Sequence, residues 1–376
     1  MLSKLLKLIV DLGDSYGADR LIEIKSAHTI LNIGLTFISA AAEILRKIAE
    51  AGLRVKVRTT ADPIIDMTHN NEYGGAISVF KLQDQLISDL TKIGVRDYTC
   101  TPYYIDNLPK LGDHCAWTES SAVIYLNSVI GACSNREGGV VDLASAIIGK
   151  TPNYGLHLKE NRKGEILFKI LIDNWNTFDL TSIGLKIGEI AGYKIPVIDG
   201  LKNLSNDDLK NLGTGSAVTG AVALIHVIGI TPEASNIEEA FHNDKPEEII
   251  EIDKKSLDDV REKYSTEWEG LPKNIGIGCP QLSKDEVIAL LKKFDGKKVL
   301  SEINFWIFCC EEVKNYIKNS KYNKIIESSG VKLSTSCLLQ PPLPRPFMTN
   351  SGKACFYSNS TYRDIDTCIR IATEGK

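Results

Sequence analysis

Nine cysteines are the residues of this sequence with the clearest capacity for chemistry. They lie at irregular intervals between positions 100 and 368, and an odd, irregular set argues against a disulfide framework. No C-x-x-C pair occurs, which argues against zinc ribbons and thioredoxin-like redox sites, and the ferredoxin spacing is absent. Buried free thiols, or a metal site assembled from distant loops, are the interpretations that remain.

Three of these cysteines share a local setting. Cys100, Cys279 and Cys337 each follow a short segment with strand character and precede a loop rich in turn residues or proline. Because ligands bind beyond the carboxyl ends of parallel strands, three thiols placed there can meet at one point. The segments are VRDYTC before TPYY, NIGIG before PQLS, and VKLSTS before LLQPPLP.

Two interpretations of these thiols stay open at this level. Free cysteine is among the most buried residue types, so each thiol could be a small core residue. Alternatively, three thiolates could hold an iron–sulfur cluster, and an iron without a protein ligand could act as a Lewis acid on a substrate oxygen. The other six cysteines divide into expected core residues (Cys309, Cys310 and Cys368) and reserve ligands (Cys115, Cys133 and Cys355).

The elements that must position these residues alternate between helix and strand. Helical periodicity marks residues 38–52 and 83–94, and residues 53–60 alternate like a strand. Residues 274–337 have the order β-α-β-α-β, in which Ser283 and Glu286 form a capping-box signature for the first helix. This order predicts an α/β fold with parallel sheets.

Length and composition indicate a globular protein of several lobes. The 376 residues, 43% of them hydrophobic, allow two or three domains or one large body with an inserted lobe. After about residue 200 the composition becomes more polar and acidic, which predicts a lobe boundary within residues 195–270. The net charge of −4 and the lack of a basic stripe argue against nucleic acid as a partner.

No segment has the character of a membrane anchor or an export signal. The longest apolar stretch, residues 215–230, is too short for a confident span and contains His226. The N-terminus reads as an amphipathic helix without a cleavage site. We therefore expect a cytoplasmic protein.

Several polar residues are candidates for contacts with an anionic substrate. Glu119 and Ser120 open an apolar helix, although Thr118 and Ser120 could simply be N-caps. Arg136, in the loop NREGG, could bind a carboxylate or phosphate through two hydrogen bonds. Lys353, in NSGKA, is either an ordinary surface lysine or a point charge that neutralises the substrate.

An ordered set of segments resembles the aconitase X family. Each segment is weak evidence alone, but together they follow the family's order from about residue 55 to the C-terminus. They are TTADPIIDM, CTPYY, HCAWTESSAVIYLNSVIGACSNREGG, AIIGKTPNYGLHLKENR, HVIGITPEA, GCPQLS, STSC and TNSGKA.

The resemblance implies the following architecture and site. The fold would be an aconitase-like, multi-lobed α/β structure with cluster loops at the carboxyl ends of strands. Cys100, Cys279 and Cys337 would hold the iron–sulfur cluster, of the 4Fe-4S type. Substrate contacts would come from Asp62, Pro63, Glu119, Ser120 and Lys353, and the argument from charge adds Arg136.

The resemblance also implies an activity and a partner. The chain would be the large subunit of a heterodimeric hydro-lyase, and a serine of a small swivelling subunit would be the catalytic base. The expected reaction dehydrates (R)-5-phosphomevalonate to trans-anhydromevalonate 5-phosphate, in isoprenoid biosynthesis by the mevalonate pathway. The alternatives are a cis-3-hydroxy-L-proline dehydratase and a non-catalytic cluster-binding subunit.

The sequence departs from the family pattern at two places near the expected site. A Gly-Val-Ser turn is expected before Asn32-Ile33-Gly34, but residues 28–31 read His-Thr-Ile-Leu. Asp62 stands where an asparagine is expected. Both changes bear on the choice of substrate.

Overall fold

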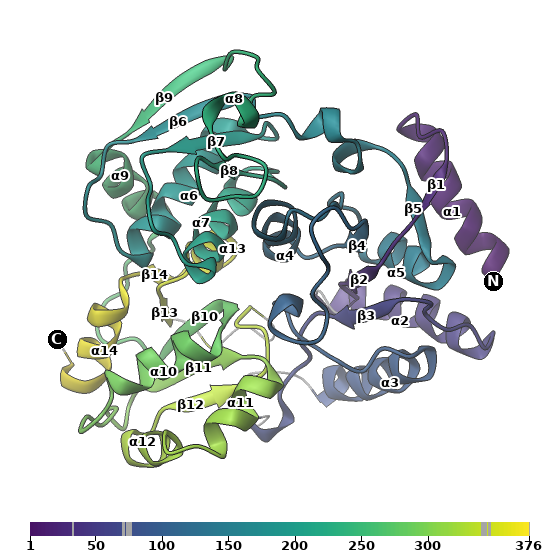
Figure 1. Cartoon of the computed structure of the whole chain (residues 1–376). Coiled ribbons are helices and arrows are strands. Elements are labelled where there is room, and N and C mark those ends of the chain that lie inside the picture. Colours follow the sequence, from purple (N-terminus) through teal and green to yellow (C-terminus); the bar gives the residue numbers. More distant parts are fainter. Residues whose placement is uncertain (32–33, 70–71, 73–76, 340–343, 345–346, 376) are drawn as a thin grey trace.

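Three lobes, each built on a parallel sheet, make up the chain, and α4 (Ser120–Tyr125) lies near the place where they meet (Figure 1). The computed structural model describes residues 1–31, 34–69, 72, 77–339, 344 and 347–375. Within the described residues, no helix is long and apolar enough to cross a membrane. The prediction of an α/β fold with parallel sheets is confirmed.

The first lobe contains a three-stranded parallel sheet of order β3-β2-β4. Helix α5 packs on this sheet through a small apolar cluster, and α1 packs on α5. A separate antiparallel pair joins β1 to β5. Its elements are α1 (Leu2–Ser15), β1 (Leu21–Glu23), β2 (Ser26–Thr29), α2 (Gly34–Glu50), β3 (Arg58–Ala61), η1 (Met67–His69), α3 (Ile77–Ile93), η2 (Pro102–Tyr104), β4 (Cys115–Trp117), α4, the π-helical turn η3 (Leu126–Ile130), α5 (Gly139–Ile148), β5 (Lys150–Pro152), η4 (Gly155–His157) and η5 (Lys159–Arg162).

The second lobe contains a four-stranded parallel sheet of order β8-β7-β6-β9. Helices α6 and α7 pack so closely that a Cβ on Gly184 would lie 2.1 Å from the carbonyl oxygen of Leu212, so only glycine fits there. This contact holds α7 against the centre of the molecule, where it also packs on α4. The elements are β6 (Ile166–Ile170), α6 (Thr177–Ala191), β7 (Pro196–Asp199), α7 (Asn206–Thr219), β8 (His226–Val227), α8 (Ile237–Ala240), β9 (Glu248–Ile252) and α9 (Lys254–Tyr264).

The third lobe contains a five-stranded parallel sheet of order β12-β11-β10-β13-β14. The predicted capping box is confirmed, because Ser283 and Glu286 bond reciprocally at the start of α10. Cys309, Cys310 and Cys368 lie in the core, as predicted. The elements are β10 (Asn274–Leu282), α10 (Lys284–Lys292), β11 (Asn304–Cys309), α11 (Glu311–Lys318), α12 (Asn323–Ser329), β12 (Lys332–Ser334), β13 (Phe347–Thr349), α13 (Gly352–Tyr357), β14 (Thr361–Tyr362) and α14 (Ile365–Glu374).

Residues 265–273 connect the second lobe to the third, and the lobe boundary expected within 195–270 stays a prediction. Two local predictions were wrong. Of residues 53–60, only those from Arg58 onward form a strand, and the segment before Cys100 makes just one bridge, between Ala61 and Tyr98. Alternating side chains predicted strands there, but among the described residues β3 pairs in its sheet only with the four residues of β2, and the segment before Cys100 pairs only with Ala61, the last residue of β3.

Candidate active site

Two sheets present the carboxyl ends of their strands to the candidate site. In the first lobe, Asp62 directly follows β3 and Glu119 lies two residues beyond β4. In the third lobe, Cys337 lies three residues beyond β12, and Lys353 begins its helix shortly after β13. Ligands of parallel α/β sheets bind at these ends, so the arrangement defines a site between the lobes.

A buried ion pair joins the two lobes at this place. The Nζ atom of Lys353 donates a short hydrogen bond to Glu119 and a second one, of 3.2 Å, to the hydroxyl of Ser120. The two charged side chains are only 10% and 9% exposed. Lys353 is therefore not a surface lysine, which was the alternative left open by the sequence.

Each member of the pair stabilises the charged form of the other. Burial alone would raise the pKa of Glu119, but the charge and hydrogen bond of Lys353 lower it to about 2. Burial alone would lower the pKa of Lys353, but the Glu119 carboxylate raises it above its usual value. Both groups are thus ionised at neutral pH.

Glu119, rather than Thr118 or Ser120, is the N-cap of α4. Its side chain accepts hydrogen bonds from the amide (3.2 Å) and the hydroxyl (2.8 Å) of Ser121. Both N-caps considered from the sequence were therefore wrong. Thr118 instead donates its hydroxyl hydrogen to the buried carboxylate of Asp142. The cap holds the Glu119 carboxylate at the start of the helix, within reach of Lys353.

Asp62 and Pro63 are buried beside this pair. Asp62 Oδ1 lies 3.3 Å from Nε2 of His28, and Nδ1 of His28 lies 2.9 Å from the hydroxyl of Thr60. Burial raises the pKa of Asp62, although the hydrogen bond from His28 opposes this effect. His28 is a site residue that the argument from sequence missed, although residues 28–31 drew attention as a departure from the family pattern. Asn32 and Ile33, of the same departure, lie outside the described residues.

The three candidate cysteines reach this region from three loops. Cys279 lies inside β10 rather than after it, at the point where pairing with β11 is interrupted between Ile277 and Leu282. Gly278 makes the interruption possible, because its φ of +114° is rarely adopted by other residues and a Cβ would lie 2.4 Å from the Phe308 carbonyl oxygen. Cys100 is buried, whereas Cys279 and Cys337 are partly exposed.

Electrostatic effects link the three thiols. Burial raises the pKa of Cys100 well above its ordinary value, and the charges of Asp62 and Cys337 add to this shift. Burial also raises the pKa of Cys337, with a contribution from Cys279, and it raises the pKa of Cys279 against the charge of Lys353. The thiols are therefore neutral in the protein alone, and a bound metal would have to displace their protons.

Hydrogen bonds to two of the candidate sulfurs bear on whether the cysteines could serve as thiolate ligands. Within the part of the chain that the structure describes, no three His, Cys, Asp or Glu side chains are grouped so as to hold one metal ion. The sulfurs of Cys100 and Cys337 each accept a backbone N–H, at 3.4 Å, from Gln281 and Leu339 respectively. Such hydrogen bonds favour thiolates, and they fit a thiolate-bound cluster.

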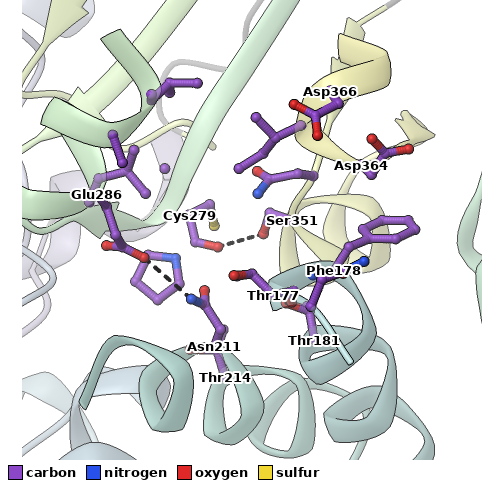
Figure 2. A pocket seen from close by; sticks show the side chains of 18 of the residues that line it. Thr177, Phe178, Thr181, Asn211, Thr214, Cys279, Glu286, Ser351, Asp364 and Asp366 are labelled. Carbon is purple, nitrogen blue, oxygen red and sulfur yellow. Dashed lines mark hydrogen bonds between the residues drawn. The ribbon is translucent and has the colours of Figure 1, made fainter. Parts of the chain in front are cut away.

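A cavity of about 340 Å³ borders the site between the second and third lobes. Figure 2 shows Ser351 donating its hydroxyl hydrogen to the carbonyl oxygen of Cys279, at 2.6 Å, and Asn211 approaching Glu286. Thr177 and Thr181 of α6 line the opposite wall. The cavity thus borders the backbone that carries Cys279.

Arg136 lines a different cavity from the one that borders Cys279. Its Nη1 donates to the carbonyl oxygen of Ala217 at 2.9 Å, and its side chain lines a shallow, open cavity with Thr118, Tyr193 and Thr219. The other candidates, which the structure brings together, are Asp62, Glu119, Ser120, Lys353 and the three cysteines.

Three successive domain models of one family match the chain. The first domain of aconitase X matches residues 1–160, the second matches residues 164–262, and the third matches residues 273–374. The chain belongs to the aconitase X family.

Proteins named as dehydratases are similar to nearly the whole chain. The phosphomevalonate dehydratase large subunit of Thermococcus kodakarensis is 40% identical over 370 residues, which cover 96% of this chain and 91% of that protein. The protein of the same name from Methanosarcina mazei is 36% identical, with 100% and 94% coverage. The cis-3-hydroxy-L-proline dehydratase of Pseudomonas aeruginosa is 28% identical over 99% of this chain but only 67% of its own length. The chain is a dehydratase, that is, a hydro-lyase, of this family.

A solved structure confirms the fold. The crystal structure of Thermococcus kodakaraensis aconitase X in its holo-form matches with a TM-score of 0.88 at 37% identity. The match covers 99% of this chain and 95% of that one. The multi-lobed arrangement is therefore that of aconitase X.

Proposed function

We propose that this chain is the large subunit of a phosphomevalonate dehydratase. The observation that carries the proposal is the buried Lys353–Glu119 pair beside the three cysteines, between the first and third lobes. The relatives named as phosphomevalonate dehydratase large subunits support the substrate, since they are 36% and 40% identical and match over nearly their whole length. The hydroxyproline enzyme is more distant and considerably longer.

Cys100, Cys279 and Cys337 would hold an iron–sulfur cluster, of the 4Fe-4S type. When bound, the cluster would supply an iron that polarises the departing hydroxyl as a Lewis acid. The relative crystallised as a holo-form supports the presence of a bound group in this fold. The hydrogen-bonded sulfurs of this chain fit that role.

The remaining residues would bind and orient the anionic substrate. Lys353 is a buried cation whose ammonium also touches the Ser120 hydroxyl, so both can contact one substrate oxygen. The raised pKa of Asp62 favours its neutral form, which limits repulsion of an anion. Arg136 stays a candidate for a more remote contact, because it lines the separate shallow cavity.

A small subunit would complete the enzyme as a heterodimer and supply the base that removes the proton. The relatives named as large subunits support such a partner. The chain would then bind the substrate and the cluster, and its partner would move the proton.

The test is anaerobic reconstitution of the chain with its small subunit, iron and sulfide, followed by incubation with (R)-5-phosphomevalonate. Consumption of this substrate and formation of trans-anhydromevalonate 5-phosphate are expected. Cys337→Ala should abolish both turnover and cluster absorption, whereas Cys133→Ala, at a buried thiol whose charged neighbours are Arg162 and Glu233, should retain both. Turnover that survives in Cys337→Ala would exclude the cluster. Dehydration of cis-3-hydroxy-L-proline instead would exclude phosphomevalonate as the substrate. A colourless, inactive complex would favour a non-catalytic subunit.

A further inference from the structure

Gln281 is a completely buried polar residue two positions after Cys279. It belongs to the segment GCPQLS, in which the proposed function uses only the cysteine. A buried carboxamide must find partners for two donor hydrogens and an acceptor oxygen, or it destabilises the fold. The partners of Gln281 therefore show what this residue does.

Its oxygen and its backbone bind the loop that carries Cys100. Oε1 accepts hydrogen bonds from the hydroxyl of Thr99, at 2.7 Å, and from the amide of Cys100, at 3.3 Å. The backbone N–H of Gln281 donates to the sulfur of Cys100 at 3.4 Å. One residue thus holds both the backbone and the side chain of that cysteine.

Its nitrogen binds the third cysteine loop. Nε2 donates to the carbonyl oxygen of Thr335, two residues before Cys337, at 2.9 Å, and to that of Cys309 at 3.3 Å. Both donor hydrogens and both acceptor positions of the amide are therefore used. No other side chain of this size has donors at one side and acceptors at the other, so these partners require glutamine.

We propose that Gln281 is a positioning residue that sets the spacing of the three cysteines before and after cluster binding. This inference rests on the proposed function, because it assumes that these cysteines hold the cluster. Gln281 lies two residues after Cys279 in the chain. It makes hydrogen bonds to Cys100 and to Thr335, in the segment before Cys337. Its loss removes these bonds between the segments, so the three thiols are still present but are no longer held at the spacing that a cluster needs.

The test compares Gln281→Leu and Gln281→Glu with wild type and with Asn127→Leu. Asn127 is a matched control, since it is a buried amide that also uses its donors and its acceptor, on the backbone of Ser134 and Ala223. Iron and acid-labile sulfide per chain are measured after anaerobic reconstitution, together with the rate of iron loss to a chelator. Changes to residues behind metal ligands cost about 10- to 100-fold in metal affinity, so iron loss from Gln281→Leu should accelerate by about tenfold or more.

Gln281→Glu keeps the shape and an acceptor oxygen, but even when protonated it has one donor hydrogen for the two carbonyl oxygens of Thr335 and Cys309, so it should fold and still lose iron faster than wild type. Thermal unfolding of the metal-free proteins should show that Gln281→Leu and Asn127→Leu are both destabilised, while only Gln281→Leu loses iron faster. The KM for phosphomevalonate should stay unchanged in Gln281→Glu, because the residue does not face the substrate, and kcat should fall with the cluster content. Wild-type iron retention in both Gln281 variants would overturn the inference alone, whereas a wild-type chain that takes up no cluster would overturn the proposed function.

Discussion

Lys314 of α11 donates a buried hydrogen bond to the carboxylate of Asp66, which lies 248 residues earlier in the chain. The two side chains are each 5% exposed. The same carboxylate accepts the amide hydrogen of Thr335 at 3.1 Å, and the amide of Asp66 donates to the Ser336 hydroxyl at 2.7 Å. The loop that carries Asp62 is therefore joined to the loop that carries Cys337.

Removal of the cation from this pair should strongly destabilise the chain. In Lys314→Met the Asp66 carboxylate stays buried without its partner, which costs about 3–5 kcal/mol of unfolding free energy. Denaturant unfolding of the metal-free protein measures this loss. Lys318→Met, at an exposed position at the end of the same helix, is the control and should change little. Equal stability of the two variants would show that the pair contributes nothing.

The pair also makes stability depend on acidity. Burial alone would raise the pKa of Asp66, but the hydrogen bonds from Lys314 and Thr68 lower it to about 2. Because an unfolded aspartate titrates near about 3.9, the stabilisation is fully present above that pH and is lost as the pH falls towards 2. Asp66→Asn should unfold at a lower denaturant concentration at pH 7 and lose less further stability on acidification. An acid dependence as steep as that of wild type would contradict the lowered pKa.

Arg162 should be a second structural link, between the first and second lobes. It is 2% exposed, and its guanidinium donates to both carboxylate oxygens of Glu233 and to the backbone carbonyl oxygens of Leu156 and Asn127. Arg162→Met should cost about 3–5 kcal/mol, because it leaves these acceptors buried without a donor. Arg162→Lys should be intermediate, since a lysine cannot make the same set of bonds.

Glu233 is the matched test of that explanation. Its side chain is 31% exposed, so Glu233→Gln should cost only on the order of 1 kcal/mol. Thermal and denaturant unfolding give the comparison. A Glu233→Gln variant as unstable as Arg162→Met would mean that the ion pair, rather than the buried carbonyl contacts, carries the stability.

Lys353 should be needed for activity beyond its effect on stability. Lys353→Met should lower kcat/KM by about 100-fold or more, which corresponds to about 2.7 kcal/mol of lost transition-state binding. The double variant Lys353→Met/Glu119→Gln removes both buried charges, so it should regain stability without regaining activity. Lys297→Met, at an exposed position, is the charge control. Recovery of activity in the double variant would reduce Lys353 to a structural role.

Asp62 should weaken the binding of an anionic substrate whenever it carries charge. Asp62→Asn keeps the shape and a hydrogen-bonding partner for His28, so it should lower the KM for phosphomevalonate at alkaline pH, where Asp62 is charged, and change it less as the pH falls. Steady-state kinetics across pH measure the change, with Asp199→Asn, on an exposed strand end, as the control. A higher KM in Asp62→Asn would show that the carboxylate itself is required.

Local features of the site followed from the sequence by itself. The strand before the Cys337 loop and the Ser283–Glu286 capping box were both predicted from their own residues. Such predictions succeed because turns and caps depend on neighbouring residues only. The same reasoning ended the strand before Cys279, which lies inside β10, and it predicted too much strand before Cys100, where only Tyr98 pairs, with Ala61 at the end of β3.

Tertiary structure alone decided which distant residues meet. Lys353 pairs with Glu119 across 234 positions, and Gln281 binds the Cys100 loop across 181. No local sequence pattern predicts such pairs. Taken alone, Lys353 could be an ordinary surface lysine, and Gln281 could be an ordinary buried amide. The sequence by itself predicted three thiols after short strands, and its ordered segments indicated the aconitase X family. Only the packing of the first lobe against the third decided that the buried side chains of Lys353 and Gln281 lie beside these thiols, because residues from distant parts of the chain meet only there.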